Sequence, residues 1–353
     1  MSVALPETRT LTTKEQWWDF VKYEPPQPPQ EPSPTELAAM SKTARRALKL
    51  ERVAYHLDLE PVPTPAMHRI INELMTQAMA NLYSPPGARP GSLIDGAANL
   101  GKTTTLLEFG RCYERELRQL YSEDIKTIDE FIPVVYVSLP AAASPKALNE
   151  LLLEFYGFPR MSRATKTSLT VRIQGLARRC RTSLFLIDDL HFLKLTRKTE
   201  RDVNDHLKNL ASTTSATFVY AGIDCEQSGL LTEGRRFGSR TTSQTANRFT
   251  MYTMTPFSIS TAAGRDEWRS VLAGVEQRLG IPQPNGVLSK GLAGYLFERT
   301  HGEMGSLMAL IRAGMVTAIT RNKPLTVDLL EPIRLSYAAT KAREQRNGSR
   351  PTR

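Results

Sequence analysis

Residues 96–103, with the sequence GAANLGKT, match the phosphate-binding pattern G-x-x-x-x-G-K-[ST] in full. Glycines in this pattern let the backbone curl so that successive N–H groups face a polyphosphate, and a following helix N-terminus adds partial positive charge. Lys102 would then reach the β- and γ-phosphates, and the hydroxyl of Thr103 would ligate Mg²⁺. The alternative is a glycine-rich turn with a chance lysine. We predict that ATP and Mg²⁺ bind here, with ATP held by Gly96, Ala97, Ala98, Asn99, Leu100, Gly101, Lys102, Thr103 and Thr104.

Residues 184–189, LFLIDD, form an apolar run that ends in two carboxylates. A buried strand of this kind would deliver Asp188 rigidly to the Mg²⁺ shell, where it would hold the metal through water. Asp189 would orient or deprotonate the attacking water. Such a run is often only a turn, but its position downstream of the loop, with a strand and helices between, favours the site. We therefore predict Lys102 and Asp189 as catalytic groups, and Thr103 and Asp188 as metal ligands.

Apolar runs and helical periodicity alternate along the middle of the chain. The sequence predicts strands at residues 92–94, 131–139, 183–188 and 216–221, and helices at 67–82, 104–111, 145–156, 169–180 and 199–212. Alternation at this spacing is typical of a parallel sheet with helical crossovers. The predicted fold class is therefore α/β, a P-loop sheet flanked by helices. Glycine-punctuated apolar segments over residues 265–345 predict a small helical lid.

The predicted domain organisation has four parts. These are an N-terminal extension with a proline-rich linker (1–64), a nucleotide-binding α/β domain (65–260), a helical lid (261–340) and a basic tail (341–353).

The N-terminal extension carries three local signals. An aromatic group, Trp17, Trp18, Phe20 and Tyr23, either forms a partner surface or packs back on the main domain. The proline-rich run at 25–32 is expected to be extended. A helix is predicted over residues 33–50, since Ser33, Pro34 and Glu36 together form an N-terminal capping signal.

The formal net charge of +10 and the pI of about 9.6 point toward polyanionic partners, although a basic protein can also be merely soluble. Residues 160–181 contain seven cations and no acidic residue. Three widely spaced cysteines give no support for a disulfide framework or a zinc site. No apolar run is long enough to span a membrane, and the N-terminus lacks a secretory pattern, so we expect a cytoplasmic protein.

At this point the chain resembles the AAA+ ATPases, and within them the TniB/TnsC group of transposition regulators, over roughly residues 65–335. The resemblance depends on the loop at 96–103 and on four further segments: IDDLHFL (187–193), TFVYAG (217–222), NRF (247–249) ahead of MTPF (254–257), and THGEMGSL (300–307). The string DDLHFL is also similar to DnaA-type initiators. The order of the parts, the short lid and the extension before the core favour the transposition group.

The resemblance implies an arginine finger that completes a neighbouring subunit's site. Carried over by position, Arg248 takes this role, because a planar, permanently charged fork stabilises charge on γ-phosphate oxygens. Arg235, Arg236 and Arg240 lie nearby, so the choice among the four stays open, and a surface basic loop is the alternative.

Two positions depart from the family pattern. The second acid of the strand is usually glutamate, whereas Asp189 is one methylene shorter. The lid segment 302–305 lacks the arginine that many AAA+ proteins direct at the γ-phosphate, and Arg312, two turns further along, is a poor substitute. Both departures suit a slow, nucleotide-gated switch.

Three further residues have a functional and an ordinary interpretation. His191 follows the two aspartates, but it has no convincing partners for zinc and is read as a structural or sensor histidine. Asp224 and Cys225 either sense the γ-phosphate or form an ordinary turn.

The resemblance implies an ATP-dependent, slow and DNA-stimulated ATPase that oligomerises head-to-tail on double-stranded DNA and recruits or activates a transposase, with an accessory targeting protein as a possible further partner. DNA would be held mainly through phosphates, by Lys146, Arg160, Arg163 and Lys166. The alternatives are a AAA+ helicase loader or replication initiator, and a nucleotide-gated signalling scaffold. No clear helix-turn-helix sequence supports an initiator, and no repeat array follows the lid.

Overall fold

The computed structural model describes residues 10–85, 87–141, 143–160, 163–190, 198–223, 225, 249–280, 286–337, 339–341 and 343. The chain divides into two compact units. The sheet unit contains the described residues up to Tyr23 together with Ala66–Thr255. The helical unit contains Glu24–Pro65 and the described residues from Pro256 onward. Residues 10–64 therefore divide between both units.

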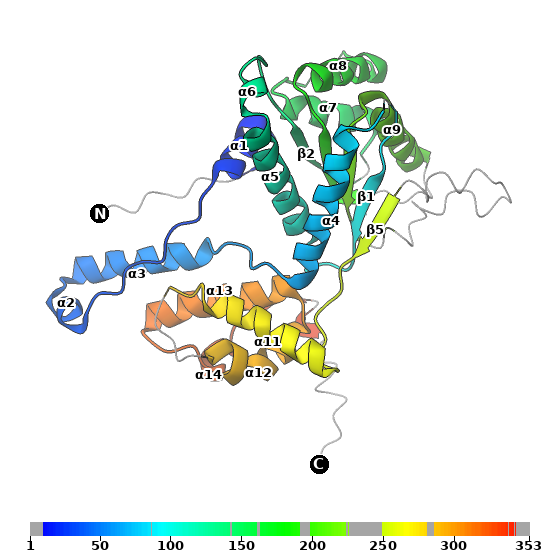
Figure 1. Cartoon of the computed structure of the whole chain (residues 1–353). Helices are drawn as coiled ribbons and strands as arrows, with labels where there is room; N and C mark the ends of the chain where they lie inside the picture. The colour runs from blue at the N-terminus through cyan, green and yellow to red at the C-terminus, as the bar shows by residue number, and fades with distance from the viewer. Residues whose placement is uncertain are drawn as a thin grey trace. The chain divides into compact units, whose positions relative to one another are not determined.

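The sheet unit is built on five parallel strands in the order β2-β3-β4-β1-β5. Figure 1 labels β2, β1 and β5. Their bounds are Gly91–Asp95 (β1), Val134–Ser138 (β2), Leu184–Asp188 (β3), Thr217–Ala221 (β4) and Phe249–Thr253 (β5). Every residue of β1, β3 and β4 is buried. Strands covered by helices on both faces tend to be apolar throughout, and the apolar runs of β2 and β3 are why the sequence predicted those two strands. The parallel α/β sheet is confirmed.

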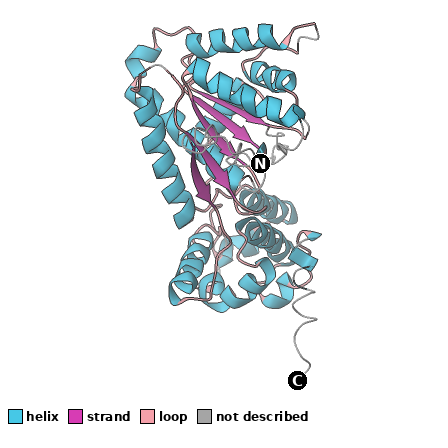
Figure 2. Cartoon of the chain, turned by 90° about the vertical axis from the view of Figure 1, so that its right-hand side faces the viewer, coloured by secondary structure: helices cyan, strands magenta, loops and turns pink. Residues whose placement is uncertain are grey.

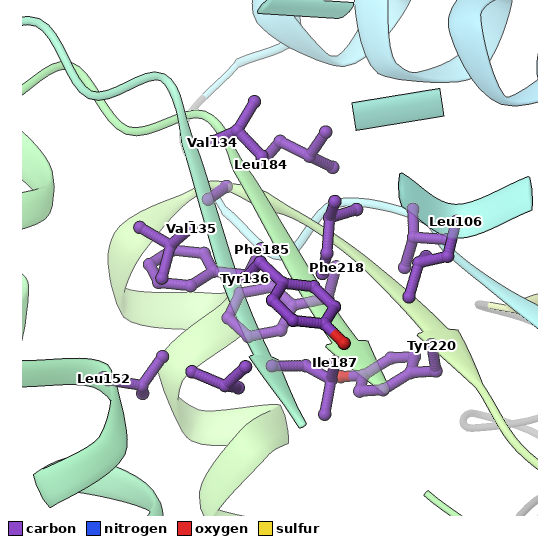
Figure 3. Packing of buried hydrophobic residues seen from close by; sticks show 14 of the residues in the cluster. Leu106, Val134, Val135, Tyr136, Leu152, Leu184, Phe185, Ile187, Phe218 and Tyr220 are labelled. Carbon is purple, nitrogen blue, oxygen red and sulfur yellow. The ribbon is translucent and has the colours of Figure 1, made fainter. Parts of the chain in front are cut away.

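Helices lie on both sides of this sheet (Figure 2). They are Lys14–Lys22 (α1), Pro65–Leu82 (α4), Lys102–Leu120 (α5), Ser122–Ile125 (α6), Pro145–Phe155 (α7), Lys166–Arg179 (α8) and Lys198–Thr214 (α9). The close view in Figure 3 places strand side chains such as Phe185 and Ile187 between Leu106 of α5 and Leu152 of α7. All four side chains are buried.

Strand β5 was not predicted from the sequence. None of its residues is fully buried, because it lies at the edge of the sheet beside β1. An edge strand with this sequence, FTMYT, carries no long apolar run to mark it.

The helical unit is formed by segments from both ends of the chain. Its elements are Pro34–Ala39 (α2), Lys42–Leu57 (α3), Ala262–Glu276 (α11), Val287–Gly291 (η4), Ala293–Thr300 (α12), Met304–Arg321 (α13) and Val327–Leu330 (α14). Tyr55 of α3 joins Trp268 and Leu272 of α11 in one buried cluster, and its hydroxyl donates to the Arg278 carbonyl (2.8 Å). Residues near position 55 therefore form a core with residues more than 200 positions later.

The single helix predicted over residues 33–50 is wrong in its extent. The Ser33 capping box is confirmed, because its hydroxyl accepts the Glu36 N–H while the Glu36 carboxylate accepts the Ser33 N–H. However, α2 ends at Ala39, and a second N-cap at Ser41 starts α3. Ser41 lies inside the predicted helix, but its side chain accepts the Ala44 N–H and caps the start of a new helix.

No helix among the described residues is long and apolar enough to cross a membrane.

Candidate functional site

The loop at 96–101 joins β1 to α5 at the carboxyl end of the sheet. Three of its residues have positive φ, namely Gly96 (148°), Asn99 (62°) and Gly101 (92°), which an L side chain rarely adopts. A Cβ added to Gly96 would lie 2.4 Å from the Met254 carbonyl oxygen. The loop therefore needs glycine at this position both for its conformation and for its close packing.

Lys102 is the first residue of α5 and is largely buried beneath this loop. Its ammonium group donates to the Ala97 carbonyl at 2.6 Å. Burial lowers the pKa of Lys102, while the nearby carboxylates of Asp95 and Asp188 favour its charged form. A cation held at the start of a helix, under a loop of curled backbone, fits the triphosphate of a nucleotide.

Asp188 ends β3 and is 4% exposed. One of its carboxylate oxygens accepts the Asp189 N–H (2.9 Å), and the other accepts the Tyr136 hydroxyl (3.2 Å). Burial raises the pKa of Asp188. Hydrogen bonds to the carboxylate oppose that shift, and the largest opposing effect comes from the Thr103 side chain. The two residues predicted to ligate Mg²⁺ are thus hydrogen-bonded to each other. A hydroxyl and a carboxylate in contact fit this hard cation, which prefers oxygen ligands.

Asp189 follows directly, with a left-handed backbone (φ 60°) that turns it away from the strand direction. Its carboxylate accepts a hydrogen bond from the Ser138 hydroxyl at 2.6 Å. Ser138 is the last residue of β2 and lies beside Asp188 in the parallel register. Strand β2 therefore contributes a hydroxyl to each aspartate, from Tyr136 and from Ser138.

Sequence reasoning missed Tyr136, Ser138 and Asp95 as members of this site. Asp95 ends β1, and its carboxylate accepts the Cys225 N–H at 3.1 Å, just after β4. The available signal was that each residue is polar and lies at or near the carboxyl end of a predicted strand. In a parallel α/β sheet these ends share one edge, where ligands bind.

Several predicted residues lie outside the described part of the chain: the finger candidates Arg235, Arg236, Arg240 and Arg248, and also His191 and Asp224. Arg312 lies in the helical unit, where its guanidinium donates to the Leu59 carbonyl at 3.2 Å. Among the described residues, no group of three or more His, Cys, Asp or Glu side chains is arranged to hold a metal ion.

The four DNA-binding candidates separate into two pairs. Lys146, at the start of α7, and Lys166, at the start of α8, both line a hollow of about 800 Å³ that also contains Asp202, Asp205 and His206. Arg160 instead pairs with Glu154 (3.3 Å), and neither Arg160 nor Arg163 lines that hollow.

The glycine loop after β1, the buried lysine that follows it and the acids at the end of β3 have the arrangement expected of a P-loop NTPase. Two solved structures share the fold. Aeropyrum pernix ORC1 in complex with DNA is 16% identical and aligns over 82% of this chain and 67% of its own, with a TM-score of 0.56. Aeropyrum pernix ORC2 is 14% identical over 78% and 69%, with a TM-score of 0.57. The fold is that of the AAA+ ATPases.

A family model described as bacterial TniB protein matches residues 52–259, more than half of the chain. The chain therefore belongs to the TniB family, as the sequence motifs predicted. A search of curated proteins found no match.

Proposed function

We propose that this protein is an ATP-dependent regulator of transposition that assembles head-to-tail on duplex DNA and recruits or activates a transposase. One observation carries the nucleotide part of this proposal. At the carboxyl end of the sheet, four side chains lie close together: Lys102, Thr103, Asp188 and Asp189. Membership of the TniB family supports the transposition part. The positive net charge supports the DNA part.

In this proposal each residue has one task. Lys102 neutralises charge on the β- and γ-phosphates, and the loop N–H groups surround them. Thr103 and Asp188 hold Mg²⁺, which when bound offsets charge that develops on the phosphate oxygens. Asp189 orients the attacking water or accepts its proton. The Ser138 hydroxyl donates to one oxygen of the Asp189 carboxylate, and an ionised carboxylate can accept a further hydrogen bond from water.

Two substitutions test the nucleotide site. Lys102→Ala should abolish binding of labelled ATP, whereas Lys126→Ala, which removes an exposed lysine paired with Glu123, should leave it unchanged. Asp189→Asn should bind ATP normally and lose hydrolysis. Unchanged ATP affinity in Lys102→Ala would refute the ATP site at this loop. Normal turnover in Asp189→Asn would show that Asp189 does not orient or deprotonate the attacking water.

Hydrolysis is proposed to require a neighbouring subunit. Arg248 would act as the arginine finger, with Arg235, Arg236 and Arg240 as the alternatives. A head-to-tail contact of this kind forms rings or open filaments, because the two surfaces involved are different. ATPase activity should then rise with protein concentration and with DNA length.

Mixing two inactive variants tests the finger. A Lys102→Ala subunit still offers Arg248, and an Arg248→Ala subunit still offers an intact ATP site. Their mixture should recover part of the activity, while each variant alone stays inactive. No recovery in a mixture that co-assembles would exclude Arg248, and the same mixing with variants of the other three arginines would then identify the finger.

For DNA, we propose that the surface at the N-terminal ends of α7 and α8 contacts the phosphate backbone. Two helix N-termini, capped by Ser144 and Thr165, lie beside Lys146 and Lys166 at the same hollow. Backbone N–H groups at helix starts and lysines both bind phosphates without reading bases. Arg160 and Arg163, on the loop before α8, form a second and separate contact.

The two pairs can be tested separately. Lys146→Gln with Lys166→Gln should weaken every duplex alike and reduce the slope of log affinity against log salt by about 2, since each phosphate contact contributes about 0.9. Arg160→Gln with Arg163→Gln should do the same. The matched control is Lys22→Gln with Lys126→Gln, which removes the same charge from exposed ion pairs. If all three double variants keep the wild-type affinity and slope, DNA binds elsewhere, with the basic tail as the next candidate.

A further inference from the structure

Helix α1 lies against α5, the helix that follows the phosphate-binding loop. Trp17 is 1% exposed, and its indole N–H donates to the Glu114 carboxylate at 2.6 Å. Arg115 of α5 donates to the Val21 carbonyl at 2.8 Å, which fixes the far end of α1. The aromatic group of the N-terminal segment therefore packs back on the sheet unit, which was one of its two predicted interpretations.

The contact depends on a glycine in α5. A Cβ added to Gly110 would lie 2.8 Å from Cη2 of Trp17 and 2.5 Å from Cδ1 of Leu186. The indole ring thus occupies space that any larger residue at position 110 would fill. We call the space beside Gly110 and Leu186 that the Trp17 indole fills the Trp17 socket.

From this socket the indole ring reaches strand β2. The rings of Trp17 and Tyr136 are stacked, with centroids 6.2 Å apart and planes 16° apart. The hydroxyl at the other end of Tyr136 donates to Asp188 (3.2 Å). A single line of contacts therefore joins α1 to the aspartate predicted to hold Mg²⁺.

The Asp188 carboxylate needs such an external support. The last torsion of an aspartate side chain is broad, so the plane of the carboxylate is fixed only by its hydrogen bonds. The Asp189 N–H binds one oxygen, and the Tyr136 hydroxyl binds the other. Tyr136 is 8% exposed, so water has little access to replace its hydroxyl. Loss of that hydroxyl would remove one of the donors that orient the carboxylate, and the Thr103 side chain, which also hydrogen-bonds Asp188, is itself a predicted ligand of Mg²⁺.

We propose that Tyr136 is a positioning residue that orients Asp188 for Mg²⁺·ATP, and that Trp17 of α1 holds the Tyr136 ring in place. The inference rests on the proposed nucleotide site and deepens it. It makes an N-terminal helix, which lies before the segment matched by the family, part of the support for the metal-binding acid.

The first test removes only the hydroxyl. Tyr136→Phe keeps the ring and its stacking, so we expect it to raise the Mg²⁺ concentration for half-maximal binding of a fluorescent ATP analogue by about tenfold, since hydrogen bonds to charged groups are strong. Binding without Mg²⁺ should not change. The matched control is Tyr156→Phe, which removes another buried hydroxyl, bonded to Thr182 before β3, and should keep the wild-type Mg²⁺ midpoint.

The second test leaves Tyr136 intact and changes its support. Trp17→Phe keeps an aromatic ring in the socket, so its Mg²⁺ midpoint should stay within about twofold of the wild-type value. Trp17→Ala should raise the Mg²⁺ midpoint several-fold and lower kcat more than it changes KM for ATP. Trp18→Ala is the control on the same helix, since Trp18 lies under Arg118 and does not contact Tyr136 through any described ring pair. Thermal unfolding identifies any variant that fails to fold.

The outcomes separate the two proposals. A wild-type chain without Mg²⁺-dependent ATP binding would overturn both the nucleotide site and this inference. Normal binding by wild type, with a Tyr136→Phe midpoint equal to that of Tyr156→Phe, would overturn the positioning role alone. A changed Tyr136→Phe midpoint with Trp17→Ala equal to Trp18→Ala would overturn the part assigned to α1.

Discussion

A single methyl group added at Gly110 measures how closely α1 packs on α5. Alanine in place of a mid-helix glycine normally stabilises a protein by about 1 kcal/mol, because glycine loses more backbone freedom on folding. At Gly110 the new Cβ would lie 2.5 Å from Leu186 and 2.8 Å from Trp17. Both neighbours are at most 1% exposed, so neither can move into solvent.

Overpacking of this kind costs about 1–3 kcal/mol and more where the neighbours are rigid. We therefore expect Gly110→Ala to lower the free energy of unfolding by about 1–2 kcal/mol despite the gain in helix propensity. Gly175, in the middle of α8, is the matched control, because no atom lies within 4 Å of a Cβ added there. Gly175→Ala should raise the free energy of unfolding by about 0.5–1 kcal/mol.

Urea unfolding followed by circular dichroism gives both values on the full chain. The same change should be made in a Trp17→Ala background, where the ring that the methyl group meets is gone. There Gly110→Ala should cost about 1 kcal/mol less than in wild type, since residues in contact are energetically coupled. If Gly110→Ala instead stabilises the protein as Gly175→Ala does, α1 does not occupy this place on α5.

Three further predictions concern other parts of the chain. Gly96→Ala should weaken ATP binding by more than about tenfold, because of its φ of 148° and the Met254 oxygen 2.4 Å from the new Cβ; equilibrium binding with the same affinity as wild type would contradict this. Burial lowers the pKa of His206 to about 4. On acidification the imidazole is therefore protonated in the unfolded chain before it is protonated in the folded chain, and the free energy of unfolding falls as the pH drops from about 6.5 toward 4. In the variant His206→Gln the amide can still donate to Asn149. Between pH 7 and pH 4.5 its free energy of unfolding in urea should fall by about 2 kcal/mol less than that of wild type, and an equal fall in both proteins would refute this role of His206. Arg299→Lys should lower the free energy of unfolding by about 2–3 kcal/mol, because the buried guanidinium donates to the carbonyls of Leu330 and Ile333, whereas the exposed control Arg265→Lys should change it little; equal effects would remove Arg299 from this role.

The sequence predicted those parts of the site whose signal is local. The loop pattern at 96–103 and the apolar run ending at Asp188 each lie within one short segment, and their residue types follow from the chemistry of phosphate and Mg²⁺. Apolar runs also predicted β2, β3 and β4, because strands buried on both faces have no polar interruptions.

What the sequence could not predict depends on residues far apart in the chain. Tyr136 read as one more apolar residue of a buried strand, although its hydroxyl bonds Asp188, 52 positions later. Trp17 had two interpretations, because its partner Glu114 lies 97 positions away and no local pattern connects them. The break between α2 and α3 was missed for a different reason, since two adjacent capping signals resemble one longer helix.

The interleaved course of the chain has a consequence for biosynthesis. Lys49 of α3 donates to the carbonyl of Thr320, 271 residues later, so this part of the helical unit cannot close until residue 320 has been made. At about 5–20 residues per second, α3 waits on the order of 15–50 s for its partner helix. The sheet residues Ala66–Thr255 are complete well before that. During this interval Tyr55 and Leu59, which end in the core of the helical unit, have no final partners, and the emerging protein presents them to chaperones or to other nascent chains.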